Sequence, residues 1–272
     1  MEKVRLDVRM TELGLVPSRE KAKALIASGG VTVNGRPARK AGEEVNEETL
    51  IEIKSDPLPF VSRGGLKLQK ALEVFPIDLE GKTCLDIGAS TGGFTDCMLQ
   101  HGAKHVCALD VGCGQLDKGL REDVRVRVME HANARYMEPG WFSEPFDFAS
   151  MDVSFISLKL ILPPLLPCLR EGGQAVALIK PQFEAGKSEV GKNGVVRDKK
   201  VHARVCAMCM QFAQDLGYWV RGLSFSPIKG PKGNIEFLLF LEKGAGERLS
   251  GEALLKQAAD AVEQAHGHCI KE

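Results

Sequence analysis

The spacing of apolar and polar positions changes several times along this 272-residue chain. From residue 83 onward, short apolar runs typical of buried strands alternate with segments that have the three-to-four-residue spacing of amphipathic helices. Strands are expected at 83–87, 105–110, 124–130, 146–152, 174–180, 218–225 and 235–242. Helices are expected at 66–75, 92–101, 114–121, 157–169 and 199–216. This alternation predicts a parallel sheet with helices on both faces.

The last two expected strands are separated only by a loop rich in Gly and Pro, residues 227–233. A parallel crossover needs about a dozen residues or more, so this loop is too short for one. The final strand should therefore run antiparallel. The sequence predicts an α/β fold with a Rossmann-like, seven-stranded sheet whose last strand is antiparallel.

Residues 1–54 have a different pattern and are expected to form a small α+β domain. Its expected elements are helices at 4–15 and 19–28 and strands at 31–33 and 45–53. Ser18 is the expected N-cap of the second helix, and Asn34-Gly35 is a hairpin turn signal.

The rest of the chain divides by composition. Segment 55–60 contains two prolines and is expected to be a stiff, extended linker. Residues 61–244 are expected to form the α/β domain. Residues 245–272 are expected to be a C-terminal tail that is helical or mobile.

The stretch from Thr83 to Thr95 reads as a strand, a carboxylate, a Gly-rich turn and a helix start. A Walker phosphate loop needs Lys where Phe94 stands, and the dinucleotide pattern G-x-G-x-x-G needs Gly where Ser90 stands. The carboxylate of Asp86 would repel a phosphate but would pair with a cation. S-adenosylmethionine (SAM), which carries an ammonium and a sulfonium, is such a ligand, and a seven-stranded sheet with an antiparallel last strand fits a SAM-dependent methyltransferase. A Gly-rich turn without a ligand is the alternative.

A second carboxylate supports this cofactor. Asp110 ends the next apolar run, where a carboxylate can accept hydrogen bonds from both ribose hydroxyls. Asn133 follows the third expected strand and is a candidate contact of adenine; an ordinary surface amide is the alternative. The expected cofactor-binding residues are Asp86, Gly88, Ser90, Gly92, Asp110 and Asn133.

Charge is distributed unevenly. The 36 Lys and Arg residues balance the 36 Asp and Glu residues, yet positions 1–40 hold nine basic residues against four acidic ones. From Ser18, the arrangement S-R-x-x-A-x-x-L-I-x-x-G-x-V-x-V-N-G resembles the αL RNA-binding motif of certain ribosomal proteins, pseudouridine synthases and tyrosyl-tRNA synthetases. The expected RNA-binding residues are Arg5, Arg9, Arg19, Lys21, Lys23, Arg36 and Arg63. A solvated basic face on a structural module is the alternative.

The eight cysteines show no convincing zinc spacing, and the sequence predicts no metal site. The pair Cys206 and Cys209 falls within an expected helix. No run of 18 or more apolar residues occurs, and we see no signal peptide. We expect a cytoplasmic protein with reduced thiols and no membrane partner.

Four charged residues fall at or near the ends of elements where the sheet should open: Lys67, Asp152, Lys180 and Glu236. A lone Lys at a strand end is usually a snorkelling side chain. Two lysines and two carboxylates at one expected edge are harder to explain in that way.

Five ordered motifs carry a family resemblance. They are Ser-Arg-Gly-Gly-Leu-Lys67-Leu, Asp86-Ile-Gly-Ala-Ser-Thr-Gly-Gly-Phe-Thr, Asp152-Val-Ser-Phe-Ile-Ser-Leu, Ile-Lys180-Pro-Gln-Phe-Glu and Gly-Asn-Ile-Glu236. From Arg5 to about Lys243 the chain resembles the TlyA (hemolysin A) family, in which an FtsJ-type ribose methyltransferase is joined to an αL RNA-binding module. The resemblance implies 2′-O-methylation of cytidine in ribosomal RNA with SAM as donor, and ribosomal RNA or ribosomal subunits as partners. It also implies that Lys67, Asp152, Lys180 and Glu236 are the catalytic set.

The chemistry is consistent with that set. A ribose hydroxyl is a poor nucleophile and needs a positioned base. We expect Lys180 to be this base, with burial and the nearby Lys67 favouring its neutral form and Asp152 orienting it. Glu236 would accept a hydrogen bond from a lysine or from the ribose. Lys67 could instead hold the target phosphate, and the sequence leaves both roles open. The base-methylating loop [DN]-P-P-[YF] is absent, because Asp152-Val-Ser-Phe155 lacks both prolines.

Three rival functions remain. A nicotinamide oxidoreductase would use a similar fold and distal acid but is disfavoured by Asp86 and Ser90. A non-catalytic RNA-binding or ribosome-assembly protein would not need the four-residue set. A pore-forming role, suggested by the hemolysin name, is disfavoured by the absence of a spanning segment. The sequence gives no firm view of the oligomeric state, although a monomer is favoured.

Overall fold

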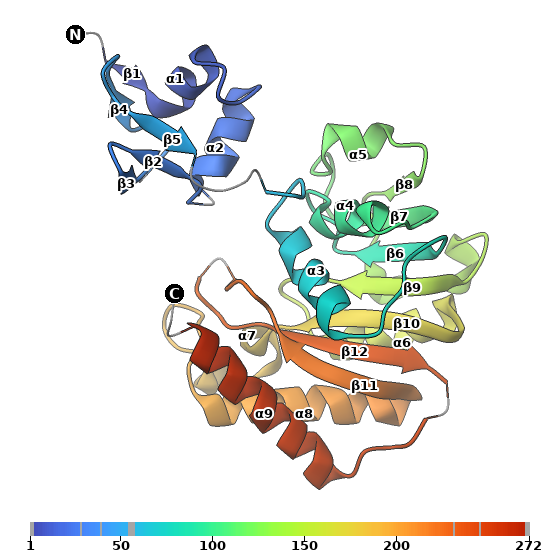
Figure 1. Ribbon diagram of the computed structural model, residues 1–272. Coiled ribbons are helices and arrows are strands. Elements are labelled where there is room, and N and C mark those ends of the chain that lie inside the picture. The colour runs from blue at the N-terminus through green and yellow to red at the C-terminus, as the bar shows by residue number, and fades with distance from the viewer. Residues whose placement is uncertain are drawn as a thin grey trace. The chain divides into compact units, whose positions relative to one another are not determined.

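The computed structural model describes residues 3–27, 29–38, 40–53, 58–230, 232–244 and 246–269. The chain divides into two compact units, Met1–Pro59 (unit 1) and Phe60–Glu272 (unit 2), each of which is described by itself (Figure 1). Half of the expected linker, residues 55–57, lies outside the described residues.

Unit 1 is built from short elements. In chain order these are β1 (Val4–Arg5), α1 (Leu6–Glu12), α2 (Arg19–Ala27), β2 (Val31–Val33), β3 (Arg36–Pro37), β4 (Glu44–Val45) and β5 (Ile51–Ile53). β1 pairs with β4, and β2 lies between β3 and β5, with antiparallel pairing throughout. Apolar residues from α1, α2, β2 and β4 form its core, among them Leu6, Met10, Ile26 and Val45.

Two of the predicted boundaries in unit 1 are wrong. The first helix begins at Leu6 rather than at residue 4, because Val4 and Arg5 pair with the β4 strand. The predicted strand 45–53 is divided, because Asn46 and Thr49 form a turn in which the Thr49 hydroxyl donates to the Asn46 side chain at 2.7 Å. The predicted cap is present: the hydroxyl of Ser18 accepts from the amide of Lys21 at 3.2 Å.

Asp7 is a fully buried carboxylate in unit 1. Its side chain pairs with Arg5 at 2.9 Å and with Arg19 at 3.2 Å, two of the residues that the sequence assigned to RNA. Hydrogen bonding from Arg5, aided by Arg19 and opposed by burial, lowers the pKa of Asp7 to about 2. A carboxyl group whose pKa is lowered by folding stabilises the fold above its ordinary pKa and loses that contribution as the pH falls.

We expect unit 1 to lose stability between about pH 4 and pH 2 through Asp7, and Asp7→Asn to remove this pH dependence while weakening the unit at neutral pH. The measurement is hydrogen exchange of the amides of residues 6–26 in the full chain, read by mass spectrometry. Glu12→Gln is the matched control, since Glu12 makes only an exposed pair with Arg9 at 3.4 Å. Unchanged exchange in Asp7→Asn at neutral pH would contradict the prediction.

Unit 2 contains the predicted α/β sheet. Its strands are β6 (Thr83–Ile87), β7 (His105–Leu109), β8 (Val126–Met129), β9 (Phe146–Met151), β10 (Leu169–Ile179), β11 (Tyr218–Phe225) and β12 (Phe237–Lys243). Within the described residues they form one seven-stranded sheet in the order β11-β12-β10-β9-β6-β7-β8. β12 runs antiparallel to both of its neighbours, which confirms the predicted last strand.

Helices cover both faces of this sheet (Figure 1). The α-helices of unit 2 are α3 (Gly64–Val74), α4 (Gly93–Gln100), α5 (Lys118–Glu122), α6 (Leu162–Leu165), α7 (Pro181–Glu184), α8 (Lys199–Leu216) and α9 (Gly251–Cys269). Apolar side chains of α3, α4 and α5 form one core with the sheet. Those of α6, α8 and α9 form the other.

The predicted helix 157–169 is the largest error in secondary structure. The structure has two 3₁₀ turns, Leu158–Leu160 and Leu166–Cys168, on either side of the short α6. Three prolines in this stretch lack the N–H that a continuous helix requires. β10 also starts earlier than predicted, at Leu169, before an irregular pairing with β9.

The C-terminal segment is helical over Gly251–Cys269 and is not a free tail. Leu254, Ala258 and Val262 are buried, and α9 packs against α8 and β11. These apolar residues recur at helical spacing, so burying them stabilises the packed position. Among the described residues, no helix combines the length and apolar character needed to span a bilayer.

Candidate active site

Two adjoining cavities open at the carboxyl ends of β6, β9 and β10. The first, of about 240 Å³, is lined by Ser62, Phe94 and all four charged residues predicted as catalytic, and we call it the tetrad cavity. The second, of about 450 Å³, contains Asp110 and Asn133, and we call it the Asp110 cavity. Gly88, Ser90, Asp152 and Ser154 line both. This edge is where ligands bind in open parallel sheets.

The four charged residues form one continuous network although they are far apart in sequence. The Nζ atom of Lys67, on α3, lies 3.0 Å from Oδ2 of Asp152 and 2.7 Å from Oε2 of Glu236. The Nζ atom of Lys180 lies 2.6 Å from Oδ1 of Asp152. Asp152 therefore bridges the two ammonium groups, and the formal charges of the network cancel.

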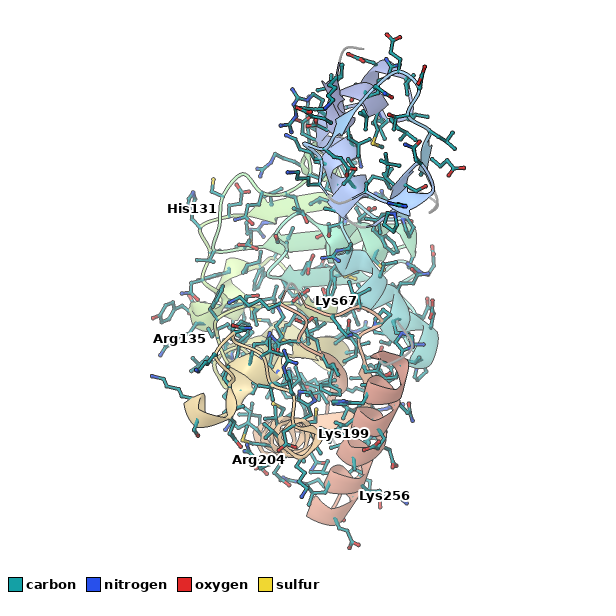
Figure 2. The ribbon with its side chains drawn as sticks, turned by 90° about the vertical axis from the view of Figure 1, so that its left-hand side faces the viewer. Lys67, His131, Arg135, Lys199, Arg204 and Lys256 are labelled. Atoms are coloured by element: carbon teal, nitrogen blue, oxygen red, sulfur yellow. The ribbon has the colours of Figure 1, made fainter. Side chains whose placement is uncertain are left out.

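The network is largely removed from water. Lys67 and Lys180 are each 7% exposed, and Glu236 is 2% exposed. Burial alone would lower the pKa of Lys67, but the charges of Asp152 and Glu236 raise it above its ordinary value. Burial likewise opposes ionisation of Asp152, but Lys67 and Lys180 hold its pKa below the ordinary value. Lys67 is thus held as a cation by two carboxylates, and its place within unit 2 is labelled in Figure 2.

Lys180 has a different pair of neighbours. Besides Asp152, its Nζ donates to the neutral hydroxyl of Ser154 at 2.9 Å. Lys180 is the last residue before α7, and its side chain lines the tetrad cavity. One carboxylate favours the protonated amine less than two do. The two lysines therefore differ in their partners: Lys67 has two carboxylates, and Lys180 has one carboxylate and one neutral hydroxyl.

The structure places Asp86 differently from the prediction. Asp86 is fully buried and lines neither cavity. Its carboxylate accepts from the hydroxyl of Thr95 at 2.7 Å and from that of Ser150 at 3.0 Å. Burial raises its pKa to about 6, and these two hydrogen bonds limit the rise. Asp86 thus ties β6 to α4 and β9, and does not present its charge to a ligand.

Glycines of the loop are required by contacts inside the protein. Gly88 has φ +81°, and a Cβ there would lie 2.9 Å from the carbonyl oxygen of Asp152. Gly92 has φ +95°, and its Cβ would lie 2.3 Å from a methyl group of Leu120. Ser90 also has positive φ, +50°. The loop therefore takes a shape that brings its backbone to the edge of both cavities.

Of the other predicted cofactor residues, Gly88, Ser90, Asp110 and Asn133 line one or both cavities, and Gly92 lines neither. Asp110 accepts from the amide of Ser90 at 2.8 Å and from that of Gly112 at 2.7 Å, so its carboxylate is fixed at the rim of its cavity. Asn133 lines the same cavity and caps a 3₁₀ turn by accepting from the amide of Arg135 at 3.1 Å.

The Asp110 cavity fits the adenosine part of SAM. Leu109, Val111, Ala132 and Ile161 provide an apolar lining, and the carboxylate of Asp110 provides an anionic acceptor of the kind that a ribose diol needs. Among the described residues, no group of three or more His, Cys, Asp or Glu is arranged to hold a metal ion.

The predicted RNA-binding residues are at the surface. Lys21, Lys23 and Arg36 are exposed in unit 1, and Arg63 is exposed at the start of α3 in unit 2. Arg9 pairs with Glu12 at 3.4 Å, and Arg5 and Arg19 share Asp7.

Sequence reasoning missed two residues of the site. Ser154 contacts Lys180, and Phe155 lines the Asp110 cavity with 91% of its surface exposed and φ +63°. An exposed aromatic residue held in left-handed backbone is a signal of function, because both features are unfavourable by themselves. The sequence signal was available, since both residues belong to the Asp152-Val-Ser-Phe motif.

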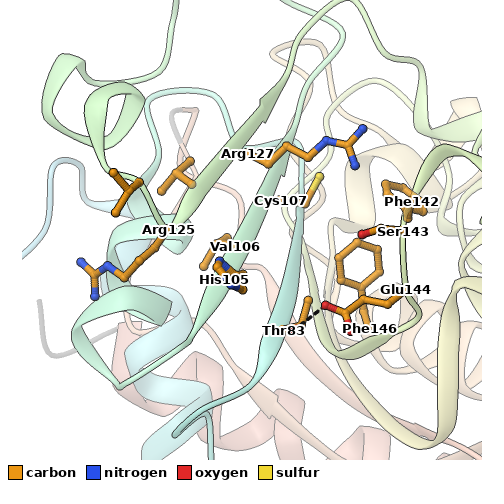
Figure 3. Close-up of a pocket in the computed structure, with 12 residues that line it drawn as sticks. Thr83, His105, Val106, Cys107, Arg125, Arg127, Phe142, Ser143, Glu144 and Phe146 are labelled. Atoms are coloured by element: carbon orange, nitrogen blue, oxygen red, sulfur yellow. Dashed lines mark hydrogen bonds between the residues drawn. The ribbon is translucent and has the colours of Figure 1, made fainter.

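A further cavity, of about 300 Å³, lies at the amino ends of β6 and β7 (Figure 3). Its two arginines are engaged: Arg125 pairs with Asp123 at 2.7 Å, and Arg127 donates to the carbonyl of Trp141 at 3.2 Å. It lies at the opposite edge from the tetrad, and no chemistry is assigned to it.

Fold and site together define an α/β methyltransferase-type domain with a buried Lys-Asp-Lys-Glu network. Comparison with known proteins agrees: residues 60–243 match the FtsJ-like methyltransferase family, and residues 4–51 match the S4 domain. The chain belongs to the FtsJ-like methyltransferases and, within them, to the TlyA (hemolysin A) group.

The relatives are similar over nearly their full length. The chain is 50% identical to the provisionally named rRNA methyltransferase YqxC of Bacillus subtilis, covering 97% of this chain and 95% of that protein. It is 43% identical to the 16S/23S rRNA (cytidine-2′-O)-methyltransferase TlyA of Mycobacterium tuberculosis, covering 97% of each. A solved structure of a provisionally named hemolysin from Streptococcus thermophilus has 49% identity and a TM-score of 0.80, covering 100% of this chain and 98% of that one.

Proposed function

We propose that this protein transfers a methyl group from SAM to the 2′-hydroxyl of cytidine in ribosomal RNA, with the S4 domain of unit 1 holding the RNA. The observation that carries the proposal is the position of Lys180, which is buried, lines the tetrad cavity and contacts both Asp152 and Ser154. The cytidine and the ribosomal RNA are taken from the printed activity of the TlyA relative.

In this mechanism Lys180 is the general base. In its neutral form it accepts the proton of the 2′-hydroxyl as the oxygen gains the methyl group. SAM, when bound, supplies a methyl group activated by its positively charged sulfur. Asp152 fixes the position of Lys180 and stabilises the ammonium that forms.

Lys67 and Glu236 have a supporting role. Lys67 pairs with both Asp152 and Glu236. Its positive charge offsets the negative charges of these two carboxylates, which would otherwise favour the protonated form of Lys180. The resulting network presents an overall neutral surface to the ribose. A role for Lys67 in holding the target phosphate is less well supported, since two carboxylates already occupy its ammonium.

The test is transfer of labelled methyl from SAM to isolated small and large ribosomal subunits and to their free RNAs. After nuclease digestion, we expect the label in 2′-O-methylcytidine, identified by mass spectrometry. Label on a base atom would overturn the ribose assignment. Absence of label in every RNA, despite SAM binding, would favour a non-catalytic RNA-binding protein.

A separate prediction concerns the cofactor. Asp110→Ala should weaken SAM binding by about 10- to 100-fold, the cost of losing hydrogen bonds to a charged group. The measurement is isothermal titration calorimetry with SAM. Asp123→Ala is the matched control, because Asp123 pairs with Arg125 outside both cavities. Equal affinities of Asp110→Ala and wild type would exclude Asp110 from the cofactor site.

A further inference from the structure

The geometry around Lys180 points to a positioning residue that the sequence did not reveal. A neutral amine has two N–H donors and one lone pair, arranged about tetrahedrally with its side-chain carbon. The Nζ of Lys180 has two protein acceptors, Oδ1 of Asp152 at 2.6 Å and Oγ of Ser154 at 2.9 Å. When both accept an N–H, the remaining direction is that of the lone pair.

We propose that Ser154 is a positioning residue for methyl transfer, holding one N–H of Lys180 so that the lone pair faces the ribose hydroxyl in the tetrad cavity. The proposal rests on the proposed function and deepens it. Ser154 lines both cavities, so its hydroxyl lies where the cofactor and target subsites adjoin. The hydroxyl exchanges no proton: the 2′-hydroxyl proton passes to the lone pair of Lys180, which becomes an ammonium.

A neutral acceptor suits this task better than a charged one. Lys67 has two carboxylate partners, which raise its pKa and keep it protonated. A carboxylate at position 154 would give Lys180 two carboxylate partners as well, and would favour its protonated form. The Ser154 hydroxyl accepts an N–H without adding negative charge, so it orients the amine and leaves it able to lose its proton.

Ser154 and Lys180 are held in place relative to each other by contacts between their own segments. Glu184, at the end of the helix that starts after Lys180, accepts from the hydroxyl of Ser157 at 2.6 Å and from the amide of Leu158 at 2.7 Å. The rings of Phe183 and Phe155 lie 5.2 Å apart between centroids. These contacts join segment 154–158 to segment 180–184, the two segments that carry the Ser154–Lys180 contact.

The test compares Ser154→Ala and Ser154→Thr in the full chain. We expect Ser154→Ala to lower the single-turnover methylation rate by about 10- to 100-fold, as for a misplaced reacting group, while SAM affinity stays within about twofold. Raising the pH should not recover the rate, because the defect is in orientation. Ser154→Thr, which keeps the hydroxyl, should remain within about threefold of wild type. Ser143→Ala, an exposed serine at the opposite edge of the sheet, is the matched control.

A second measurement reads the contact directly. In protein labelled with ¹⁵N-lysine, the Nζ signal of Lys180, assigned with Lys180→Met, should show faster hydrogen exchange in Ser154→Ala, while the signal of Lys67 is unchanged. A wild-type rate or an unchanged Lys180 signal in Ser154→Ala would overturn the proposal, as would equal losses in Ala and Thr variants. If the wild type methylates no RNA although Ser154→Ala changes the Lys180 signal, the proposed function is overturned, and with it the positioning role of Ser154 in methyl transfer.

Discussion

Lys180→Met is expected to lower methyl transfer by about 10²- to 10⁴-fold, the contribution of a general base, while SAM affinity stays within about twofold. The fold should persist, because Asp152 keeps Lys67 as a partner at 3.0 Å after Lys180 is lost. Rates are measured under single turnover with labelled SAM, and folding is checked by the thermal midpoint. Lys187→Met, an exposed lysine on the loop after α7, is the matched control.

Lys180→Arg separates a base from a simple positive charge. A guanidinium keeps the charge but is not deprotonated in proteins, so it cannot accept the 2′-hydroxyl proton. If Lys180 is the base, the Arg and Met variants should be similarly inactive. Substantial activity in Lys180→Arg would show that position 180 acts through its charge, and the proposed mechanism would then be wrong.

Lys67→Met is expected to destabilise unit 2 by about 3–5 kcal/mol, the usual result of removing one partner of a buried ion pair. The change leaves Glu236, 2% exposed, without its ammonium partner at 2.7 Å. The measurement is denaturant unfolding followed by tryptophan fluorescence, since both tryptophans, Trp141 and Trp219, belong to unit 2. A loss below about 1 kcal/mol would show that water compensates the carboxylate and that the network contributes little to folding.

The double variant Lys67→Met/Glu236→Gln isolates the charge. Removing both charges should restore most of the lost stability, and the double-mutant cycle gives their coupling energy. Methylation should remain impaired. In the double variant Asp152 would have Lys180 as its only lysine partner, and its carboxylate would then favour the protonated form of Lys180 more strongly. Recovery of full activity together with stability would show that Lys67 is only a structural counter-ion.

The same pair predicts the alkaline limit of stability. Folding raises the pKa of Lys67 above its ordinary 10.5, so its contribution is complete below that value. The contribution is lost only as the pH rises through the higher folded value. Lys67→Met should therefore remove part of the alkaline loss of stability of unit 2.

The strand and helix order followed from local patterns alone. The helix predicted over 199–216 has these limits in the structure, where Asp198 caps its start and Gly217, with φ +105°, ends it. The antiparallel last strand followed from the length of one loop. The stretch 157–169 shows where such reasoning fails: its apolar spacing suggested a helix, and the backbone of three prolines prevented one.

The sequence by itself determined which chemistry the site contains. Parallel strands end at one edge, so charged residues after β9 and β10 had to meet there, and the family motifs identified all four members of the network. The contacts that each of them makes could be read only from the three-dimensional structure. Pairing of Lys67 with two carboxylates, and of Lys180 with one carboxylate and Ser154, depends on side chains up to 169 residues apart. Asp86 shows the same limit. Because β6 is buried on both faces, its sequence pattern does not tell whether the carboxylate faces a ligand or the protein interior. In the structure the carboxylate faces the interior and accepts from Thr95 and Ser150.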